Sequence, residues 1–495
     1  MVKVLGVCVV ALLCRLAVAQ TEPTMEEISA RLTPNDLKAD VSFLASDLLQ
    51  GRASPSQGLD VAAEYIAAQF RRAGLEVAGD DGYFQTAWYD SVTPNFAGME
   101  LTLKTTKTRI KAQTQSITLQ QAFSNDFTRV AVFKDWSTDW ESLAAVHSEE
   151  VRGKVLVLDL PDANTIMTIS KKRAIINRLE PVLLILPRSQ SPGNTAAGLC
   201  EIPCPSSPRV IYISDDAIWA ALRSEKREFS DATISVHIPP PGVVRVKLHN
   251  VLGVLRGADP VLRNTYVLVT AHYDHLGTKG NGGSDCIYNG ANDNASGTAS
   301  VIEIANALAA LPIRPKRSIV FLTFFGEELG LLGSRYYASH PVFPIGSTVA
   351  DVNLEQLGRT DSDGTANVDL VNVTGYDFST LTDVFRKTGE DSGLRVVKAE
   401  KLNERYFGAS DNQALADVGI PAHTLSVGYF FPDYHQSGDR WPKLDYNNLA
   451  KVDRTIALSV FRVANSIAMP EWNKDIPCTR MYIKARQASR GIGSQ

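Results

Sequence analysis

The fold is decided by the stretch Tyr266-Val267-Leu268-Val269-Thr270-Ala271-His272-Tyr273-Asp274, in which an apolar run ends in a histidine and an aspartate. A near-continuous apolar run of this length is typical of a strand buried on both faces of a largely parallel sheet. Ser318 to Phe325 repeats the pattern, and between the two Ser296 to Leu311 carries apolar residues at helical spacing. Alternating strands and helices predict an α/β layered domain.

The same alternation continues on both sides of this stretch. Strands are predicted at Ser347 to Asn353 and Ala422 to Val427, and a helix at Phe378 to Thr388. Near the N-terminus, Pro34 to Ala73 predicts two helices separated by a polar turn. We therefore expect a three-layer α/β fold with a mostly parallel, mixed sheet flanked by helices.

The middle of the chain has a different texture. Short β-rich runs such as Glu100 to Leu103 and Lys154 to Leu160 dominate, with one helical stretch at Thr168 to Leu179. The segment Pro239-Pro240-Pro241-Gly242 can continue neither a strand nor a helix and marks a boundary. The prediction is a β-rich domain over residues 95–243, inserted between residues 20–94 and 244–473 of the α/β domain.

Composition limits the possible functions. The 495 residues favour about three domains, or one large domain with an insertion. Lys and Arg number 50 against 54 Asp and Glu, a net charge of -4 with no basic stripe, so nucleic acid is not an expected partner. Residues 474–495, with five Lys or Arg and one Asp, predict a solvated, flexible basic tail. Oligomeric state is left open.

Residues 1–19 have the features of a signal peptide. Lys3 precedes the apolar run Val4 to Cys14, and Ala17-Val18-Ala19 forms a small-x-small site, which predicts cleavage after Ala19. The apolar run is too short to span a bilayer, so the mature chain is expected to be secreted or periplasmic without a membrane span. Two disulfides or buried free thiols are both compatible with the remaining cysteines, Cys200, Cys204, Cys286 and Cys478.

Open α/β sheets bind ligands at the carboxyl ends of their strands, and here those positions hold histidines and carboxylates. A lone histidine or acidic pair is usually structural. Buried like charges in such number repel unless a cation compensates them, so a divalent metal site is predicted. The residues concerned are His272-Tyr273-Asp274, Asp293, Glu327-Glu328, Glu355 and Tyr434-His435.

The donor types favour zinc. Two imidazoles and three carboxylates suit this metal, and one bridging carboxylate would let them hold two ions with a position left for water. The remaining carboxylate, Glu327 or Glu328, is then available as a base.

These motifs resemble the co-catalytic zinc exopeptidases of peptidase clan MH, which include bacterial leucyl aminopeptidases, glutamate carboxypeptidase II and glutaminyl cyclases. The resemblance implies a phosphorylase/hydrolase-like zinc peptidase fold. It also implies that residues 95–243 are a protease-associated domain, in which Val151 to Leu158 resembles a recurring strand. The motifs are Asp47 to Arg52, His272 to Gly277, Gly290 to Gly297, Phe324 to Ser334, Asn353 to Arg359, Ser410-Asp411 and Tyr434-His435.

The resemblance implies a role for each position. One zinc would be held by His272, Asp293 and Glu355, and the other by Asp293, Glu328 and His435. Glu327 would be the general base, Asp274 would fix the tautomer of His272, and Tyr434 would hydrogen-bond the developing oxyanion.

The sequence departs from the family in two places. Glu355 stands where the aminopeptidases usually have Asp, which leaves single-zinc behaviour open. Asn412 replaces a histidine that the family often has after Ser-Asp, and Asp411 is a candidate for a substrate contact or a structural turn. The other histidines near the motifs, His275, His340 and His423, are assigned to structure or surface.

The leading functional expectation is an exported zinc aminopeptidase acting on peptides with a free N-terminus. A glutaminyl-cyclase-like single-zinc acyltransferase is one alternative. Another is a carboxypeptidase of the glutamate carboxypeptidase type, with Arg359 and Arg405 as candidates for binding the substrate carboxylate. A receptor-like relative without metals is the non-enzyme alternative.

Overall fold

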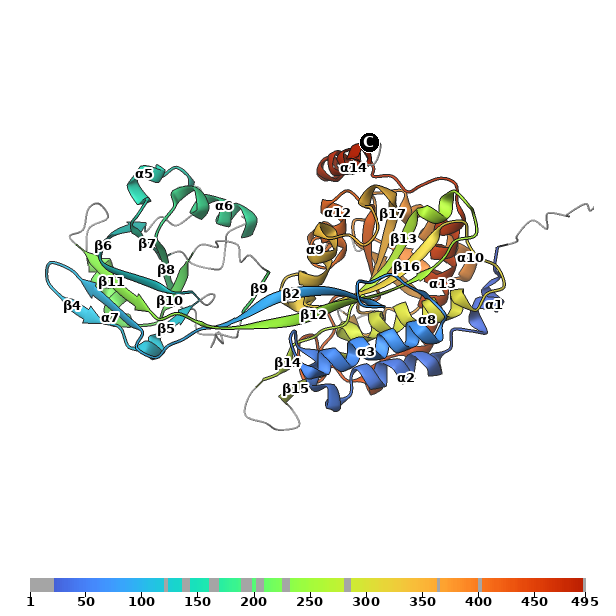
Figure 1. Cartoon of the computed structure of the whole chain (residues 1–495), viewed down its shortest axis with the longest axis horizontal. Helices are drawn as coiled ribbons and strands as arrows, with labels where there is room; N and C mark the ends of the chain where they lie inside the picture. Colours follow the sequence, from blue (N-terminus) through green and yellow to red (C-terminus); the bar gives the residue numbers. More distant parts are fainter. Residues whose placement is uncertain are drawn as a thin grey trace, which may run out of the picture. The chain divides into compact units, whose positions relative to one another are not determined.

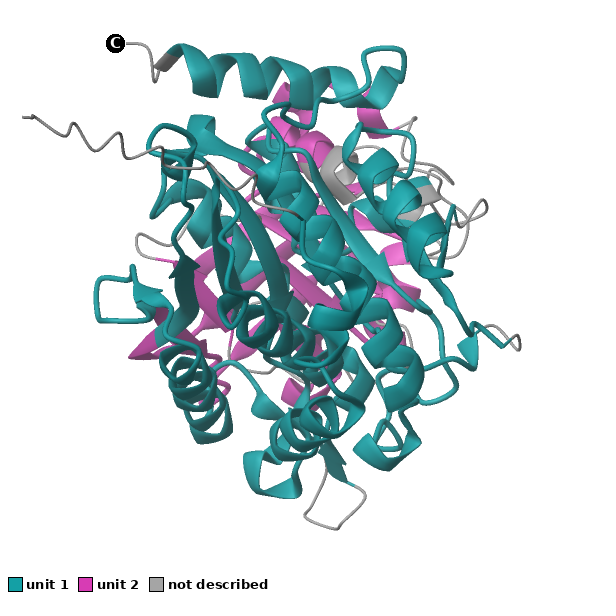
Figure 2. Ribbon diagram, turned by 90° about the vertical axis from the view of Figure 1, so that its right-hand side faces the viewer, with its two compact units in different colours: residues 1–87, 248–495 teal, residues 88–247 magenta. Residues whose placement is uncertain are grey.

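The computed structural model describes residues 22–119, 123–135, 143–159, 169–187, 198–201, 209–224, 232–279, 286–362, 366–398 and 403–492. The predicted signal peptide, residues 1–19, and Cys204 lie outside these ranges. The chain divides into two compact units, Met1–Ala87 with Leu248–Gln495, and Trp88–Lys247 (Figures 1 and 2).

The first unit is built on a mixed sheet with a parallel centre. Its four central strands, β20, β17, β13 and β16, are parallel neighbours, and β12 joins β16 antiparallel. The ten-stranded sheet runs in the order β19 (Arg395–Val397), β18 (Leu370–Val373), β20 (Ala422–Ser426), β17 (Thr348–Leu354), β13 (Tyr266–His272), β16 (Ser318–Phe324), β12 (Gly242–Leu255), β2 (Phe84–Thr93) and β9 (Gly198–Glu201), with β1 (Glu76–Val77) on β12. Its last strand, β9, consists of residues of the second unit. The predicted mixed sheet is confirmed, but its parallel part is the centre and the β18–β19 pair, whereas the pairs β1–β12, β12–β16, β18–β20 and β2–β9 are antiparallel.

Helices cover both faces of this sheet (Figure 1). On one face α8 (Gly297–Ala309) and α13 (Tyr446–Asn465) contact β13, and on the other α9 (Leu332–Ser339) contacts β16 and α12 (Asn412–Asp417) contacts β17. All seven residues of β13 are buried. Alternate residues point to opposite faces of a strand, so a strand between two helical layers must be apolar throughout, as the opening stretch predicts.

The N-terminal helices begin and end where local capping requires. Thr33 caps α2 (Pro34–Leu44) with Pro34 in its first turn, and the Ser56 hydroxyl accepts from the backbone N–H of Leu59 at the start of α3 (Gln57–Arg72). The short helix η1 (Asp47–Arg52) lies between them. Helix α10 (Leu381–Ser392) begins three residues later than predicted, because Phe378 instead bonds back to Gly375 in a turn.

The second unit contains an eight-stranded sheet with its own apolar core. Its strands β6, β7, β8 and β10 are parallel, and the other pairs are antiparallel. The order is β4 (Arg109–Lys111), β3 (Glu100–Lys104), β11 (Thr233–Ile238), β6 (Asn125–Asp135), β7 (Val155–Leu158), β8 (Leu183–Pro187), β10 (Val210–Ile213) and β5 (Ile117–Leu119), with helices α5 (Ser148–Val151), α6 (Ile169–Leu179) and α7 (Asp216–Ser224).

The edges of the second unit differ from the predicted 95–243. The units divide after Ala87 and after Lys247. The reason is that β2 and β12 are long strands that contribute residues to both units, and the proline segment only separates β11 from β12. A boundary within a continuous strand leaves no mark in composition.

The prediction of a flexible tail over residues 474–495 is wrong. Arg480–Ile492 forms the helix α14, in which Tyr482 and Arg486 are buried. The Arg486 guanidinium donates to the backbone carbonyl of Thr348 at 2.6 Å, and the Tyr482 ring lies 4.9 Å from that of Trp472. Four of the tail's five basic residues therefore belong to an amphipathic helix with one face on the domain.

Two further predictions concern cysteines and the membrane. Cys200 is disulfide-bonded, whereas Cys286 and Cys478 are thiols, so the four cysteines do not form two disulfides. Among the described residues, no helix combines the length and apolarity needed to cross a bilayer.

Candidate metal centre

The strand ends bring the predicted residues together. His272 is the last residue of β13, and Glu327 and Glu328 follow β16 in the turn η6 (Glu327–Leu329). Glu355 directly follows β17, and His435 lies in the loop after β20. Because these four strands are parallel neighbours, their carboxyl ends meet at one edge of the sheet.

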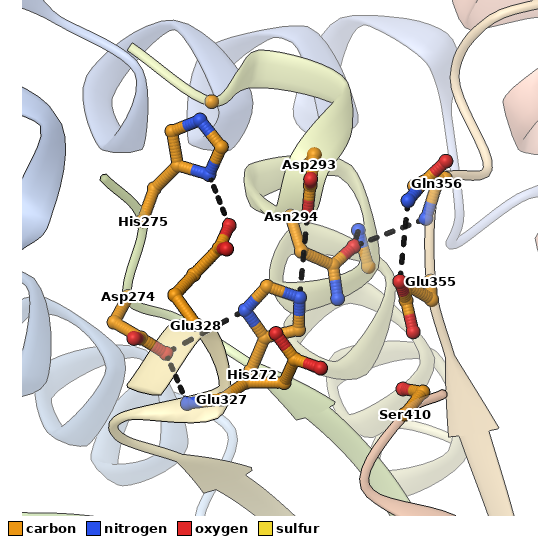
Figure 3. A network of polar contacts seen from close by, with 12 residues as sticks. His272, Asp274, His275, Asp293, Asn294, Glu327, Glu328, Glu355, Gln356 and Ser410 are labelled. Carbon is orange, nitrogen blue, oxygen red and sulfur yellow. Dashed lines mark hydrogen bonds and ion pairs between the residues drawn. The ribbon is translucent and has the colours of Figure 1, made fainter. Parts of the chain in front are cut away.

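Asp293 reaches this edge from the loop before α8. The His272 Nε2 atom lies 3.4 Å from Asp293 Oδ1, and its Nδ1 atom lies 3.5 Å from Asp274 Oδ1 (Figure 3). Both distances exceed that of an ordinary hydrogen bond. The Asp274 carboxylate also accepts the backbone N–H of Glu327 at 3.0 Å and so connects the ends of two strands.

A second group of side chains surrounds Glu328. The His435 Nε2 atom lies 3.1 Å from Asp293 Oδ2 and 3.3 Å from Glu328 Oε2. On the other side, His275 Nδ1 lies 2.7 Å from Glu328 Oε1 (Figure 3). His275, which the sequence analysis assigned to structure or surface, is buried at this centre. Its position three residues after His272 was the signal that could have drawn attention to it.

Two sets of donor atoms are close enough to bind an ion. His272, Asp293 and Glu355 form one set and His275, Asp293 and Glu328 the other, each with its ligand atoms within 4.8 Å of one another. Both ring nitrogens of His272, Oε1 of Glu328 and Oε2 of Glu355 are buried without a hydrogen-bond partner. Buried polar atoms are normally satisfied, and imidazole and carboxylate are zinc ligands, so the donors fit a divalent metal of the zinc type.

The electrostatics of the centre also favour a cation. Burial raises the pKa of Glu355 to about 7 and that of Glu327 well above its usual range. Burial alone would lower the pKa of His435, but Asp293 and Glu328 raise it to about 10. Burial alone would likewise raise the pKa of Asp293, but the nearby imidazoles of His272 and His435 instead hold it far below normal. The carboxylates therefore give this centre a negative electrostatic potential, which favours a bound cation.

The polar residues of the segment Gly290 to Gly297 tie its loop to the loop carrying Glu355. The Asn292 side-chain oxygen accepts from Gly358 N at 2.8 Å, and the Asn294 amide donates to the Leu354 carbonyl at 2.9 Å. The Ser296 hydroxyl accepts from Leu357 N at 3.1 Å. A Cβ at Gly297 would lie 2.3 Å from the Leu354 carbonyl oxygen, so this close approach requires glycine.

Tyr434 lies beside the centre in an aromatic wall. Its ring stacks on that of His435 with centroids 4.0 Å apart. A cavity of about 60 Å³ opens next to Glu355 and is lined by Glu355, Gln356, Tyr406, Ala409, Ser410, Thr424, Tyr429, Phe430 and Tyr434. A larger cavity of about 670 Å³ lies against α14 and involves none of the predicted site residues.

The structure also places the residues tied to the alternative functions. Arg359 is buried and bound to Asp361 at 2.6 Å and Asp433 at 2.9 Å, and these bonds raise its pKa. Nothing is described of the Arg405 side chain. Asn412 donates to the Phe407 carbonyl at 3.0 Å and accepts from the Thr424 hydroxyl at 2.8 Å, so it serves the scaffold. Asp411 is buried.

The two remaining histidines have local partners. The ring of His423 lies between the Ser379 hydroxyl at 2.6 Å and the Thr374 carbonyl at 2.7 Å, and burial lowers its pKa to about 4. The His340 ring contacts the Ser339 hydroxyl at 3.0 Å and stacks on Tyr336. None of these interactions of His423 and His340 involves a metal donor.

The fold and the donors define a class: an α/β protein with a metal centre at the carboxyl edge of a mixed sheet. Residues 250–460 match the family model of Peptidase family M28.

Curated relatives agree with this assignment. Aminopeptidase YwaD of Bacillus subtilis is 25% identical over 45% of this chain and 46% of its own length. A probable zinc metalloprotease of Pyrenophora tritici-repentis is 38% identical over 54% of this chain and 63% of its own length. The chain thus spans about half the length of the curated relatives it matches.

Solved structures confirm the fold. An aminopeptidase from Aneurinibacillus sp. strain AM-1 aligns with a TM-score of 0.61 at 19% identity, covering 91% of this chain and all of the other. A zinc aminopeptidase from Bacillus subtilis aligns with a TM-score of 0.52 at 17% identity, covering 88% of this chain and 97% of the other. The predicted zinc peptidase fold is that of these neighbours.

Proposed function

We propose that this protein is an exported, zinc-dependent aminopeptidase that removes residues from peptides with a free N-terminus. One observation carries the proposal: two sets of imidazole and carboxylate donors share Asp293 at the carboxyl edge of the sheet. The similarity of residues 250–460 to Peptidase family M28 supports it. Export rests on the sequence of residues 1–19, and residues 95–243 are proposed to be a protease-associated domain on sequence resemblance.

We assign His272, Asp293 and Glu355 to one zinc and Asp293, Glu328 and His435 to the other. Bound zinc would supply Lewis acidity toward the scissile carbonyl and toward water. The contacts of His435 Nε2 with Asp293 and Glu328 support its place in the second set. A single zinc stays the alternative, because Glu355 has one more methylene than the aspartate usual at its position.

Glu327 is the proposed general base. It is partly buried beside the donors, and desolvation raises its pKa well above that of an exposed glutamate, which favours proton transfer near neutral pH. Glu327 would take a proton from the attacking water and return it to the leaving amine. Asp274 holds the Glu327 backbone and faces the His272 ring, and the Tyr434 hydroxyl would donate to the developing oxyanion.

The charges favour an aminopeptidase over a carboxypeptidase. An α-ammonium group suits a centre rich in carboxylates, where the partly buried Glu327 and the buried Asp411 lie near the donors. A substrate carboxylate would need an available cation, and Arg359 is already bound by Asp361 and Asp433. This pairing counts against the glutamate-carboxypeptidase-like alternative.

A panel of aminoacyl anilides and their N-acetylated counterparts tests the proposal, with zinc measured on the purified protein. We expect hydrolysis of the free amines and little of the blocked compounds; equal turnover of both would exclude an aminopeptidase. Conversion of an N-terminal Gln peptide to pyroglutamate would instead support the glutaminyl-cyclase-like alternative.

A substitution at the base separates chemistry from metal binding. Glu327→Gln should lower kcat by about 10²- to 10⁴-fold while the zinc content stays that of the wild type. Loss of zinc from this variant would show that Glu327 is a ligand and that the assignment of the neighbouring Glu328 is wrong.

A further inference from the structure

Two buried side chains outside the donor sets form hydrogen bonds with the backbone of the loop that carries Asp293. Arg52, at the end of η1, approaches from the N-terminal part of the chain, and Asp439 approaches from the loop after His435. Both are almost completely buried, Arg52 at 1% and Asp439 at 0% exposure. Neither is a ligand candidate or a base in the proposed mechanism.

Arg52 binds backbone carbonyls of several segments at once. Its guanidinium donates to Tyr273 at 2.8 Å, Asn289 at 2.7 Å and Gly290 at 3.0 Å, and also to Leu44. Its own carbonyl accepts from His275 N at 3.2 Å. One side chain thus fixes the strand end that holds His272 and the entry to the Asp293 loop. Only Arg has a rigid fork that can serve so many acceptors.

Asp439 binds the next residues of the same loop through their N–H groups. Its carboxylate accepts from Asn292 at 2.9 Å and from Asp293 itself at 3.1 Å, and its backbone carbonyl accepts from Ala291 at 3.3 Å. From Asn289 to Asp293, each residue therefore has a backbone group held by Arg52 or Asp439. Charge-assisted bonds of this kind are roughly twice as strong as neutral ones.

Among the described residues, the segment itself supplies a partner to only one of these five backbone groups, the Gly290 carbonyl, which also accepts from Ala295 N at 3.1 Å. Gly290 has φ +58°, and Asp293 and Asn294 have non-helical dihedrals before α8 begins. At Gly290 a Cβ would lie 2.2 Å from the Asp293 carbonyl oxygen and 2.4 Å from the His275 ring. The backbone is therefore irregular and tightly packed, and its position depends on side chains that supply the missing hydrogen bonds.

We infer that Arg52 and Asp439 form a positioning clamp that sets the Asp293 carboxylate between the two groups of metal donors. They act on the metal through the loop, as supporting residues around metal ligands do. This inference rests on the proposed function for its catalytic consequence, but its effect on zinc affinity can be measured without any peptidase assay.

The test compares clamp variants with matched controls elsewhere in the same unit. The clamp variants are Arg52→Lys and Asp439→Asn, which change the side-chain size little. The controls are Arg317→Lys and Asp453→Asn, at residues that are also buried. Arg317 donates to the Ile467 carbonyl at 2.8 Å, and Asp453 accepts from the Ser300 hydroxyl at 2.8 Å. Zinc dissociation constants come from competition with a chromophoric chelator. We expect about 10- to 100-fold weaker zinc binding in the clamp variants and wild-type binding in the controls.

Two further readouts exclude a merely structural role. In the metal-free protein, Asp439→Asn should accelerate amide hydrogen exchange at residues 291–293 and leave α8 protected. With zinc restored to saturation, kcat should fall while KM stays near the wild-type value. Wild-type zinc affinity in both clamp variants, or an equal loss in the controls, would overturn the inference; if Arg52→Lys does not fold, Asp439→Asn decides alone. A wild-type protein that binds zinc but hydrolyses no anilide would refute the proposed function and leave the clamp standing.

Discussion

The Nδ1 atom of His275 lies 2.7 Å from Oε1 of Glu328, while Oε2 of the same carboxylate faces His435 Nε2 at 3.3 Å. Glu328 is thus held between two imidazole rings whose centroids are 5.7 Å apart. The contact with His275 lacks the alignment of a hydrogen bond, since both of its atoms are buried without a hydrogen-bond partner. Either histidine is placed to share the second metal with Glu328.

We expect His435 to be the ligand and His275 to orient Glu328. His435 Nε2 approaches both Asp293 and Glu328, whereas the short contact of His275 is with Glu328 alone. His435→Ala should therefore lower the zinc content from two ions to one. His275→Ala should keep two ions at saturating zinc, with the weaker one bound about 10- to 100-fold less tightly. Metal analysis with chelator titration distinguishes the two, and loss of an ion from His275→Ala alone would reverse the assignment.

A buried acid pair behind the centre predicts how stability depends on pH. Tyr65 donates to Asp40 at 2.6 Å, and burial raises the pKa of Asp40 to about 6. Burial, reinforced by the charge of Asp40, raises the pKa of Glu303 from 4.5 to about 8. Between pH 4.5 and about pH 8, the folded protein keeps a proton on Glu303 that the unfolded chain has lost. The free energy of unfolding must then fall as pH rises across this range.

Glu303→Gln removes this titration. At pH 8 we expect the variant to unfold at a higher temperature than the wild type, with a free energy of unfolding that is larger by on the order of a few kcal/mol. At pH 5 the two proteins should unfold at nearly the same temperature. Thermal unfolding of the zinc-loaded protein at both pH values checks this. Glu26→Gln, at an exposed residue of α1 (Met25–Ser29), is the control and should show no such difference. An equal effect of Glu303→Gln at both pH values would contradict the assigned cause.

Helix α14 is expected to contribute to stability. The Tyr482 ring is 6% exposed and packs against Trp472 and Phe407, at centroid distances of 4.9 and 5.7 Å. Truncating a buried aromatic side chain leaves a cavity, so Tyr482→Ala should lower the free energy of unfolding by about 3 kcal/mol. Met481→Ala, at a neighbouring residue that is 59% exposed, should have little effect. Equal denaturation midpoints for the two variants would mean that α14 does not pack as described.

This helix shows where sequence reasoning failed. The strands β13 and β16 were predictable because a strand covered on both faces must be apolar along its length, and their ends then placed His272 and Glu328 together. Helix α14 buries only a narrow face, so its arginines suggested a solvated tail. Arg486 is buried because backbone carbonyls of another segment accept its bonds, and such partners leave no local pattern.

The site was only partly predictable for the same reason. The metal donors lie at strand ends, where the order of the motifs along the chain indicates their meeting. Arg52 and Asp439 act through the backbone of residues distant in sequence, and no residue type or spacing marks such contacts. His275 was dismissed because a single histidine after a strand is usually structural, and only its distance to Glu328 reveals its position.

The last prediction concerns the cost of an unpaired donor. Glu355 is partly buried at the centre, and its buried Oε2 atom has no hydrogen-bond partner within the protein. A buried carboxylate without a partner destabilises the folded state unless a cation compensates it. Glu355→Gln should therefore raise the melting temperature of the metal-free protein. The same substitution should also abolish most of the stabilisation by zinc. For the wild type, zinc at 100-fold above its dissociation constant should raise the free energy of unfolding by about 2.7 kcal/mol.

Asp351→Asn is the matched control for Glu355→Gln. Asp351 is fully buried in β17, its Oδ1 accepts from the Thr270 hydroxyl at 2.9 Å, and its Oδ2 has no hydrogen-bond partner. It belongs to neither donor set, so its amide variant should stabilise the metal-free protein and still respond to zinc as the wild type does. Thermal unfolding with and without zinc measures both effects. A full zinc response in Glu355→Gln would remove Glu355 from the ligands, because zinc binding would then not depend on its carboxylate.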